Sequence, residues 1–134
     1  MAAAPRPPVR LRVAISPEVW HEEVGRFSAV STAGVAAKRE RARLEHDGVA
    51  GRDLLACDAD GSDGTQLAGL VKVYVPINHQ PPSGRPFGFV FSPERDDDGP
   101  YLELIAYGER HPKHGTRSVY HRAHKRLHGR YPDQ

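Results

Sequence analysis

Apolar and polar residues alternate at the start of the folded part of the chain, and three later segments are rich in β-branched and aromatic residues. The alternating apolar residues are Val9, Leu11, Val13 and Ile15. Their period of two predicts a half-buried strand. The later segments cover residues 67–77, 85–92 and 101–108, with turns rich in Pro, Gly and Asp between them. Because these connections are short, we expect the three strands to form an antiparallel meander.

Two helices are expected between the first strand and the meander. Ser16 and Pro17 form a typical helix start, an N-cap residue followed by proline at the first helical position. The apolar residues that follow at helical spacing are Trp20, Val24 and Phe27. A second, Ala-rich helix is predicted over residues 33–47, with a thin apolar face made by Ala33, Ala37 and Leu44 and an end at Gly48. The Ser/Thr-containing turn between the two helices predicts an αα-hairpin.

A last helix is predicted to begin at Thr116 or Arg117, after a break at residues 112–115. Its apolar stripe consists of Val119, Ala123 and Leu127. The order of elements predicts an α+β fold with an N-terminal strand, a helical hairpin, a three-stranded antiparallel meander and a C-terminal helix. The 134 residues suit one domain. We place it at residues 9–130, between a disordered Ala/Pro-rich lead (1–8) and a short tail (131–134).

Basic residues are concentrated near the C-terminus, although the formal net charge is only +2. Residues 117–130 contain five Lys or Arg and three His but no acid. A solvated face and a phosphate-binding face are both compatible with this pattern, and the lack of compensating acids favours phosphate contact. The RNA-binding candidates are Arg117, Arg122, His124, Lys125, Arg126 and Arg130.

The cysteine content and the lack of long apolar runs bear on the compartment. Cys57 is the only cysteine, so no intramolecular disulfide can form. The sequence contains neither a signal-peptide pattern nor an apolar run of the ~20 residues that a membrane helix needs. We therefore expect a cytoplasmic protein with no membrane partner.

Two patterns suggest a metal site, and both are incomplete. The stretch CDADGSDGTQ resembles a calcium loop, but Asp63 stands where the turn needs glycine. His124 and His128 share a helix face near His121, yet no HExxH motif, cysteine or acid accompanies them. We expect an ordinary loop, and neither a metal nor another cofactor.

The order of elements and the last third of the chain resemble the RelE/ParE superfamily of toxin-antitoxin toxins. The phrase LAGL (67–70) introduces the first meander strand, and the aromatic strand FGFVF (87–91) follows it. The last predicted strand runs into Gly108, Glu109, Arg110 and His111, and the pair Val119-Tyr120 comes shortly after. The resemblance covers roughly residues 9–130, and the last third carries its most recognisable motif.

This resemblance implies a RelE-like toxin that cleaves mRNA on the ribosome without a metal and is neutralised by a cognate antitoxin protein. It places Arg110 on the strand-end arginine that stabilises the scissile phosphate, and Tyr120 on the tyrosine of the Val-Tyr pair. Lys72 and Arg85 are candidates to add positive charge from neighbouring strands.

Cleavage also needs a base and an acid. His111, His114 and Glu109 are candidates for proton transfer, because they follow the last strand and because histidine titrates near neutral pH. For Arg110, Lys72 and Arg85 a solvated or salt-bridged side chain is the alternative. For Tyr120 the alternative is a ring packed on the sheet, and for His111 and His114 it is a polar loop.

Two departures from the family pattern favour a different function. Gly88 stands where the family often has arginine, and Lys72 is the one lysine of the preceding strand. The alternative is a RelE/ParE-fold binding module that lacks nuclease chemistry and contacts gyrase, RNA or a protein partner. A structural or regulatory small protein is a third interpretation.

Overall fold

Three helices pack on a curled six-stranded sheet in the computed structural model, which describes residues 9–77, 85–112 and 117–134. The helices are α1 (Pro17–Glu23), α2 (Thr32–Asp47) and α3 (Val119–His128). The strands are β1 (Arg10–Ala14), β2 (Val49–Ala50), β3 (Leu55–Ala56), β4 (Val71–Tyr74), β5 (Phe87–Asp96) and β6 (Gly99–Glu109), in the sheet order β2-β1-β6-β5-β4-β3. The predicted α+β class is confirmed. The expected count of four strands is wrong, because β2 and β3 have two residues each and are too short to show a period. The predicted lead (1–8) lies outside the described residues.

The first strand lies beside the last one. β1 pairs in parallel with β6, where Val13 is opposite Leu102, and pairs antiparallel with β2. Leu11 and Val13 pack against the core while Arg10 and Arg12 are exposed, so the period-two prediction is confirmed within β1. It is wrong for Val9, which precedes the strand and is 74% exposed. The pairing of β1 with β6 fixes the N-terminal part of the chain to the strand that carries Arg110 at its end.

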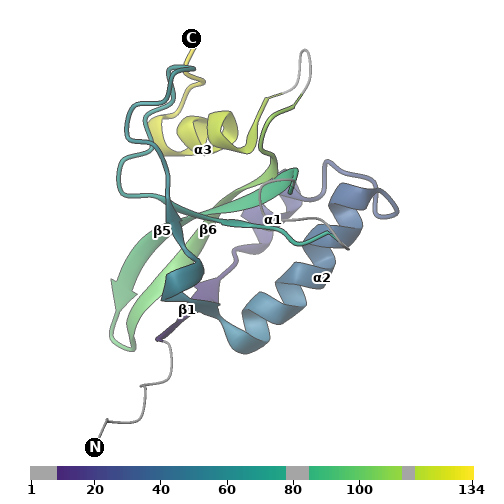
Figure 1. The fold of residues 1–134 in the computed structure, drawn as a ribbon, viewed down its shortest axis with the longest axis vertical. Coiled ribbons are helices and arrows are strands. Elements are labelled where there is room, and N and C mark those ends of the chain that lie inside the picture. The colour runs from purple at the N-terminus through teal and green to yellow at the C-terminus, as the bar shows by residue number, and fades with distance from the viewer. Residues whose placement is uncertain (1–8, 78–84, 113–116) are drawn as a thin grey trace, which may run out of the picture.

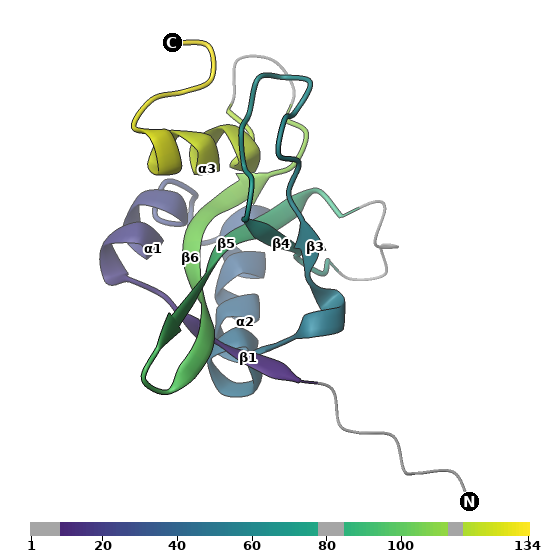
Figure 2. The ribbon, with the colours of Figure 1, turned by 90° about the vertical axis from the view of Figure 1, so that its left-hand side faces the viewer.

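The meander of β4, β5 and β6 is antiparallel, as predicted. β4 begins later than expected because the chain turns at Gly69, whose φ is 83°, and this turn buries Leu67 and Leu70. β5 and β6 continue past their predicted ends to a turn at Gly99, where φ is 103°. Figure 2 shows the resulting long, curved hairpin.

The two faces of the sheet carry side chains of different size. The face toward α1 and α2 is aromatic and aliphatic, with Phe89 fully buried. On this face the hydroxyl of Tyr107 donates to the carbonyl oxygen of Ala33 in α2 at 2.7 Å. The other face is made of small residues such as Ala106, so Ala123 of α3 packs closely on it. Figure 1 shows the sheet between α2 and α3.

The predicted helical stripes are confirmed in α2 and only in part in the other helices. Ala33, Ala37 and Leu44 are buried, whereas Phe27 packs on the core from beyond the end of α1. α3 begins at Val119 rather than at Thr116 or Arg117, and Thr116 lies outside the described residues. The prediction that Leu127 is a core residue is wrong, because 46% of its surface is exposed. His124 is buried in this part of α3 instead.

The two edges of the sheet are linked by a short connection. β2 and β3 lie at opposite edges, and only the 3-10 turn η1 (Gly51–Asp53) and Leu54 separate them in sequence. Such a short link holds the two edges near each other, so the sheet curls into an incomplete barrel. We call the line between β2 and β3–β4 the seam. Figure 2 shows this side of the molecule, with β3 next to β4.

Candidate functional site

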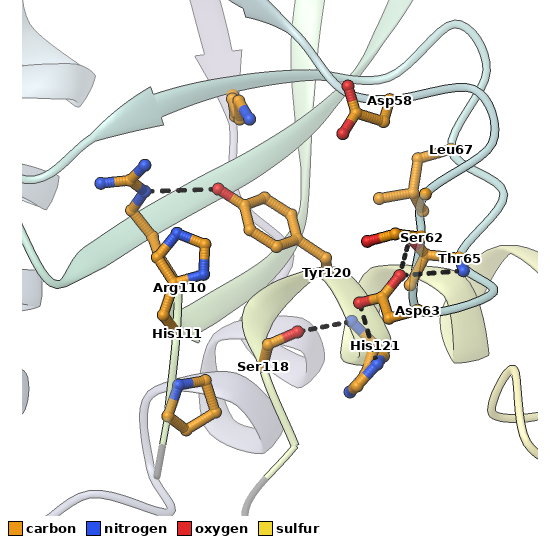
Figure 3. Close-up of a pocket in the computed structure, with 13 residues that line it drawn as sticks. Asp58, Ser62, Asp63, Thr65, Leu67, Arg110, His111, Ser118, Tyr120 and His121 are labelled. Atoms are coloured by element: carbon orange, nitrogen blue, oxygen red, sulfur yellow. Dashed lines mark hydrogen bonds and ion pairs between the residues drawn. The ribbon is translucent and has the colours of Figure 1, made fainter. Parts of the chain in front are cut away.

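A cleft of about 420 Å³ opens where β4, the end of β6 and the first turn of α3 meet the loop between β3 and β4. We call it the cleft, and Figure 3 shows its lining. Four of the five predicted catalytic residues line it: Lys72, Arg110, His111 and Tyr120. The facing wall contains Asp63, Thr65 and His121, which come from the β3–β4 loop and from α3. Residues far apart in sequence therefore meet on the α3 face of the sheet.

Arg110 is held by three contacts directly after β6. Its Nη1 donates to the carbonyl oxygen of Arg85 at 2.8 Å, and its Nε donates to the hydroxyl of Tyr120 at 3.4 Å. The guanidinium carbon lies 3.7 Å from the centre of the Tyr74 ring. These contacts orient the planar guanidinium at the cleft wall and leave its Nη2 without a hydrogen-bond partner among the described residues.

Gly88 supports this position of Arg110. A Cβ atom added at Gly88 would lie 3.5 Å from Cγ of Arg110 and 3.4 Å from the carbonyl oxygen of Val73. The aliphatic part of Arg110 thus covers the space above Gly88, and a long side chain at residue 88 would compete for that space. Arg110 therefore reaches the space above Gly88 from the end of β6.

Lys72 provides a second positive charge near Tyr120. Its Nζ lies 4.8 Å from the centre of the Tyr120 ring and 5.8 Å from that of Tyr74. Within the described part of the chain, neither Lys72 nor Arg110 forms an ion pair. Two cations on aromatic rings without a direct ion pair suit an anion, although the carboxylates of Asp58 and Asp63 also line the cleft.

Asp63 and His121 form an ion pair on the facing wall, with Oδ2 of Asp63 3.1 Å from Nε2 of His121. The other carboxylate oxygen of Asp63 accepts from the hydroxyl of Thr65 at 2.8 Å and from its amide at 3.1 Å. Burial alone would raise the pKa of Asp63, but the bonds from Thr65 and the nearby His121 outweigh it and lower that pKa. Asp63 is thus a fixed carboxylate that orients the imidazole of His121.

The remaining proton-transfer candidates are placed less tightly. His111 is exposed at the mouth of the cleft. Glu109 is half-buried at the end of β6. His114 lies outside the described residues. Among the described histidines of the cleft, His121 is the one with a carboxylate partner, and no pattern in the sequence connects it to Asp63.

The side chain of Arg85 lies apart from the cleft. It lines a second cavity of about 430 Å³ at the seam, together with Tyr74 and Leu55. Its backbone carbonyl still accepts from Arg110, so the peptide of Arg85 contributes to the cleft and its guanidinium does not. The Nε of Arg85 is buried and has no hydrogen-bond partner among the described residues.

Two of the predicted RNA-binding residues are used inside the fold. Arg122 donates from Nε and Nη2 to the two carboxylate oxygens of Glu23 at 2.9 and 2.6 Å. Arg126 bonds Glu22 at 2.7 Å and Glu23 at 3.2 Å. Glu23 is buried in α1, so these pairs fasten α3 to α1. The two guanidiniums are therefore already engaged by carboxylates.

The other four predicted RNA-binding residues differ in their contacts and in their exposure to solvent. The Nδ1 of buried His124 accepts from the amide of Gln66 at 3.0 Å. Arg117 pairs with Asp133 at 2.6 Å, and Lys125 lies over the ring of Tyr131. The exposed candidates are Lys125 and Arg130.

The structure also bears on cofactor and thiol chemistry. No group of three His, Cys, Asp or Glu side chains is placed to hold a metal ion within residues 9–77, 85–112 and 117–134. His128 contacts the carbonyl oxygen of Gln66 through Nε2 at 2.8 Å, so His124 and His128 of α3 both contact the backbone of this loop.

Burial raises the pKa of Cys57 to about 11, so its thiol is protonated near neutral pH.

No family model, characterised protein or solved structure matches this chain. In the described part of the chain, no helix has the length and apolar character needed to cross a membrane.

Proposed function

We propose that the cleft binds an RNA phosphodiester and that the chain is a RelE-like toxin, a metal-independent endoribonuclease that cuts mRNA on the ribosome. In this proposal a cognate antitoxin protein restrains it in the cytoplasm. The observation that carries the proposal is the placement of Arg110 and Lys72, without carboxylate partners in the described residues, on either side of Tyr120 in one cleft. The order of a first strand, two helices, an antiparallel meander and a last helix is also in line with the resemblance, apart from the added strands β2 and β3.

In the proposed reaction, the 2'-oxygen of the substrate forms a bond to phosphorus and the bond from phosphorus to the 5'-oxygen breaks. Arg110 donates to the non-bridging phosphate oxygens, and Lys72 offsets the charge that develops on the phosphorane. His111, at the cleft mouth, takes the proton of the 2'-hydroxyl. The hydroxyl of Tyr120 gives its proton to the departing 5'-oxygen, and the neighbouring guanidinium of Arg110 stabilises the phenolate that remains.

A binding module without nuclease activity is the second candidate. It is favoured because neither histidine of the cleft is well placed as a base. His121 is engaged by Asp63, and its Nδ1 is buried. His111 is exposed, and within the described residues no hydrogen bond or ion pair orients it as a base. Such a module would use the same cations to hold RNA, or another anionic partner, without cutting it.

Cleavage of a reporter mRNA in a purified translation mixture tests the proposal. We expect the wild-type protein to cut the mRNA and Arg110→Ala to reduce the cleavage rate by about 100-fold or more, because it removes the main phosphate donor. Arg95→Ala is the matched control, since Arg95 is exposed in the hairpin of β5 and β6 and does not line the cleft. Intact mRNA with the wild-type protein would exclude the nuclease, and RNA binding that depends on Arg110 would then support the second candidate.

A further inference from the structure

Arg110 of the cleft contacts two residues of the cavity at the seam. Tyr74 lines the seam cavity, and the guanidinium of Arg110 lies 3.7 Å from the centre of its ring. The Nη1 of Arg110 also bonds the carbonyl oxygen of Arg85, whose side chain lines the seam cavity. The two sites are therefore neighbours, connected through Arg110, although no described residue lines both.

The lining of the seam cavity combines apolar surface with guanidinium groups. Its apolar part includes Leu55 of β3, Val73 of β4 and Pro76. Leu55 is 43% exposed on a two-residue edge strand, so its side chain is accessible to a ligand in the cavity. The volume of about 430 Å³ lies within the range of small-ligand sites. These features suit a planar, largely apolar group rather than an ion alone.

The charged groups of the seam cavity suit a phosphate attached to that planar group. The Nε of Arg85 is buried without a hydrogen-bond partner in the described part of the chain, and a buried donor of this kind is normally satisfied. Arg43 enters the cavity from α2, where Nε donates to Glu40 at 2.9 Å. Asp53 of η1 is the one acid among the residues that line the cavity. Because Nε itself is covered, an anion would contact the rest of the guanidinium of Arg85, which lines the cavity and forms no ion pair among the described residues.

We propose that the seam cavity is a nucleotide subsite, which binds the base and phosphate of one nucleotide next to the phosphodiester held in the cleft. This inference rests on the proposed RNA-binding function of the cleft and extends it to a single-stranded substrate. The base packs on Tyr74, Leu55 and Pro76, and its phosphate accepts from Arg85. The substrate strand runs from Arg110 across Tyr74 to the seam, so the protein recognises at least one nucleotide beyond the one it would cut.

Binding of a length series of 2'-O-methyl oligonucleotides, which lack the attacking hydroxyl, tests the subsite. We expect affinity to rise by about tenfold when the oligonucleotide is extended by one nucleotide in one direction, the size of a typical base-stacking gain. Arg85→Ala and Leu55→Asp should remove this gain while leaving the affinity of the shortest oligonucleotide unchanged. Arg110→Ala should weaken every length by the same factor. Equal weakening of all lengths by Arg85→Ala, or no effect of it, would overturn the subsite.

A second measurement separates failure of the subsite from failure of the cleft. Titration with a nucleoside monophosphate should shift the methyl NMR signals of Val49, Leu55 and Val73, which line the seam cavity, and not those of Leu127. If these methyl signals shift while the oligonucleotides do not bind, the proposed function fails and the subsite stands. If oligonucleotides bind and the methyl signals stay unchanged, the subsite is wrong and the cleft stands. If Arg85→Ala does not fold, Arg85→Lys, which retains a charge, is measured in its place.

Discussion

The Nε of Arg110 donates to the hydroxyl of Tyr120 across 3.4 Å, and this contact joins the residue that follows β6 to the first turn of α3. The two residues are ten apart in sequence and lie side by side in the lining of the cleft (Figure 3). The Nζ of Lys72 lies over the ring of Tyr120, so the side chain of Tyr120 contacts both cations of the cleft. Its hydroxyl and its ring therefore have separable roles.

Tyr120→Phe removes the hydroxyl and retains the ring. We expect RNA cleavage to slow by about 100-fold, a typical contribution of a positioned proton donor. RNA affinity should change little because the ring still supports Lys72. Single-turnover cleavage and fluorescence anisotropy measure the two effects. Tyr101→Phe is the control, since Tyr101 begins the distant part of β6 and its ring contacts Arg12. A wild-type cleavage rate in Tyr120→Phe would exclude Tyr120 as the acid.

Glu23→Gln tests the fastening of α3 to α1. The carboxylate of Glu23 accepts from Arg122, Arg126 and the amide of Tyr107, and only 1% of the residue is exposed. Because the change leaves the arginines without their buried partner charge, we expect the free energy of unfolding to fall by about 3 kcal/mol. Urea unfolding measures it.

Glu22→Gln is the matched control for that substitution. Glu22 is the preceding residue and bonds the same Arg126, but its side chain is largely exposed. Solvent screens an exposed pair, so stability should stay close to that of the wild type. Equal loss in the two variants would contradict the account of Glu23 as the buried anchor.

His124 should make the fold sensitive to acid. Its burial, and then the nearby His128, lower its pKa. Protonation of Nδ1 would also remove the acceptor of the bond from the amide of Gln66. In the unfolded chain the pKa of histidine is about 6.5. Below that pH the unfolded state binds a proton that the folded state resists, so stability is full above about pH 6.5 and falls as pH drops. Thermal unfolding between pH 7.5 and 5 measures this loss.

His124→Asn retains an acceptor for Gln66 and cannot be protonated in this range. We expect it to flatten the pH dependence of the melting temperature. His21→Asn, at an exposed position of α1, should leave the wild-type dependence in place. The same slope in all three proteins would show that His124 does not cause it.

Patterns within single segments account for most of the fold. Ser16 and Ser31 accept from backbone amides as helix caps, and Gly48 ends α2, which are local signals. The pairing of β1 with β6, and the seam closed by η1, depend on contacts between distant segments, which periodicity does not contain. Leu127 is exposed because α3 turns His124 toward the loop at Gln66, a long-range contact that an apolar stripe does not reveal.

The candidate site was predictable where a motif covers it and not where it is built by tertiary contacts. Arg110 and Tyr120 follow from the C-terminal motif, and the structure brings them within hydrogen-bonding distance. Because segment 117–130 contains no acid, the sequence predicted that Arg122 and Arg126 contact RNA. In the structure both form ion pairs with Glu23. Their acidic partners in α1 come from about a hundred residues earlier, so charge counts within one window miss them. The pair of Asp63 and His121 was hidden for the same reason.

The salt dependence of RNA binding tests the central claim, that Arg110 holds a phosphodiester in the cleft. Affinity of a 2'-O-methyl oligonucleotide is measured over a series of salt concentrations for wild type, Arg110→Ala and Arg95→Ala. Each phosphate contact on a single strand contributes about 0.7 to the slope of log affinity against log salt. We predict that Arg110→Ala lowers the slope by about 0.7 and weakens binding, while Arg95→Ala matches the wild type. An unchanged slope and affinity in Arg110→Ala would contradict the claim.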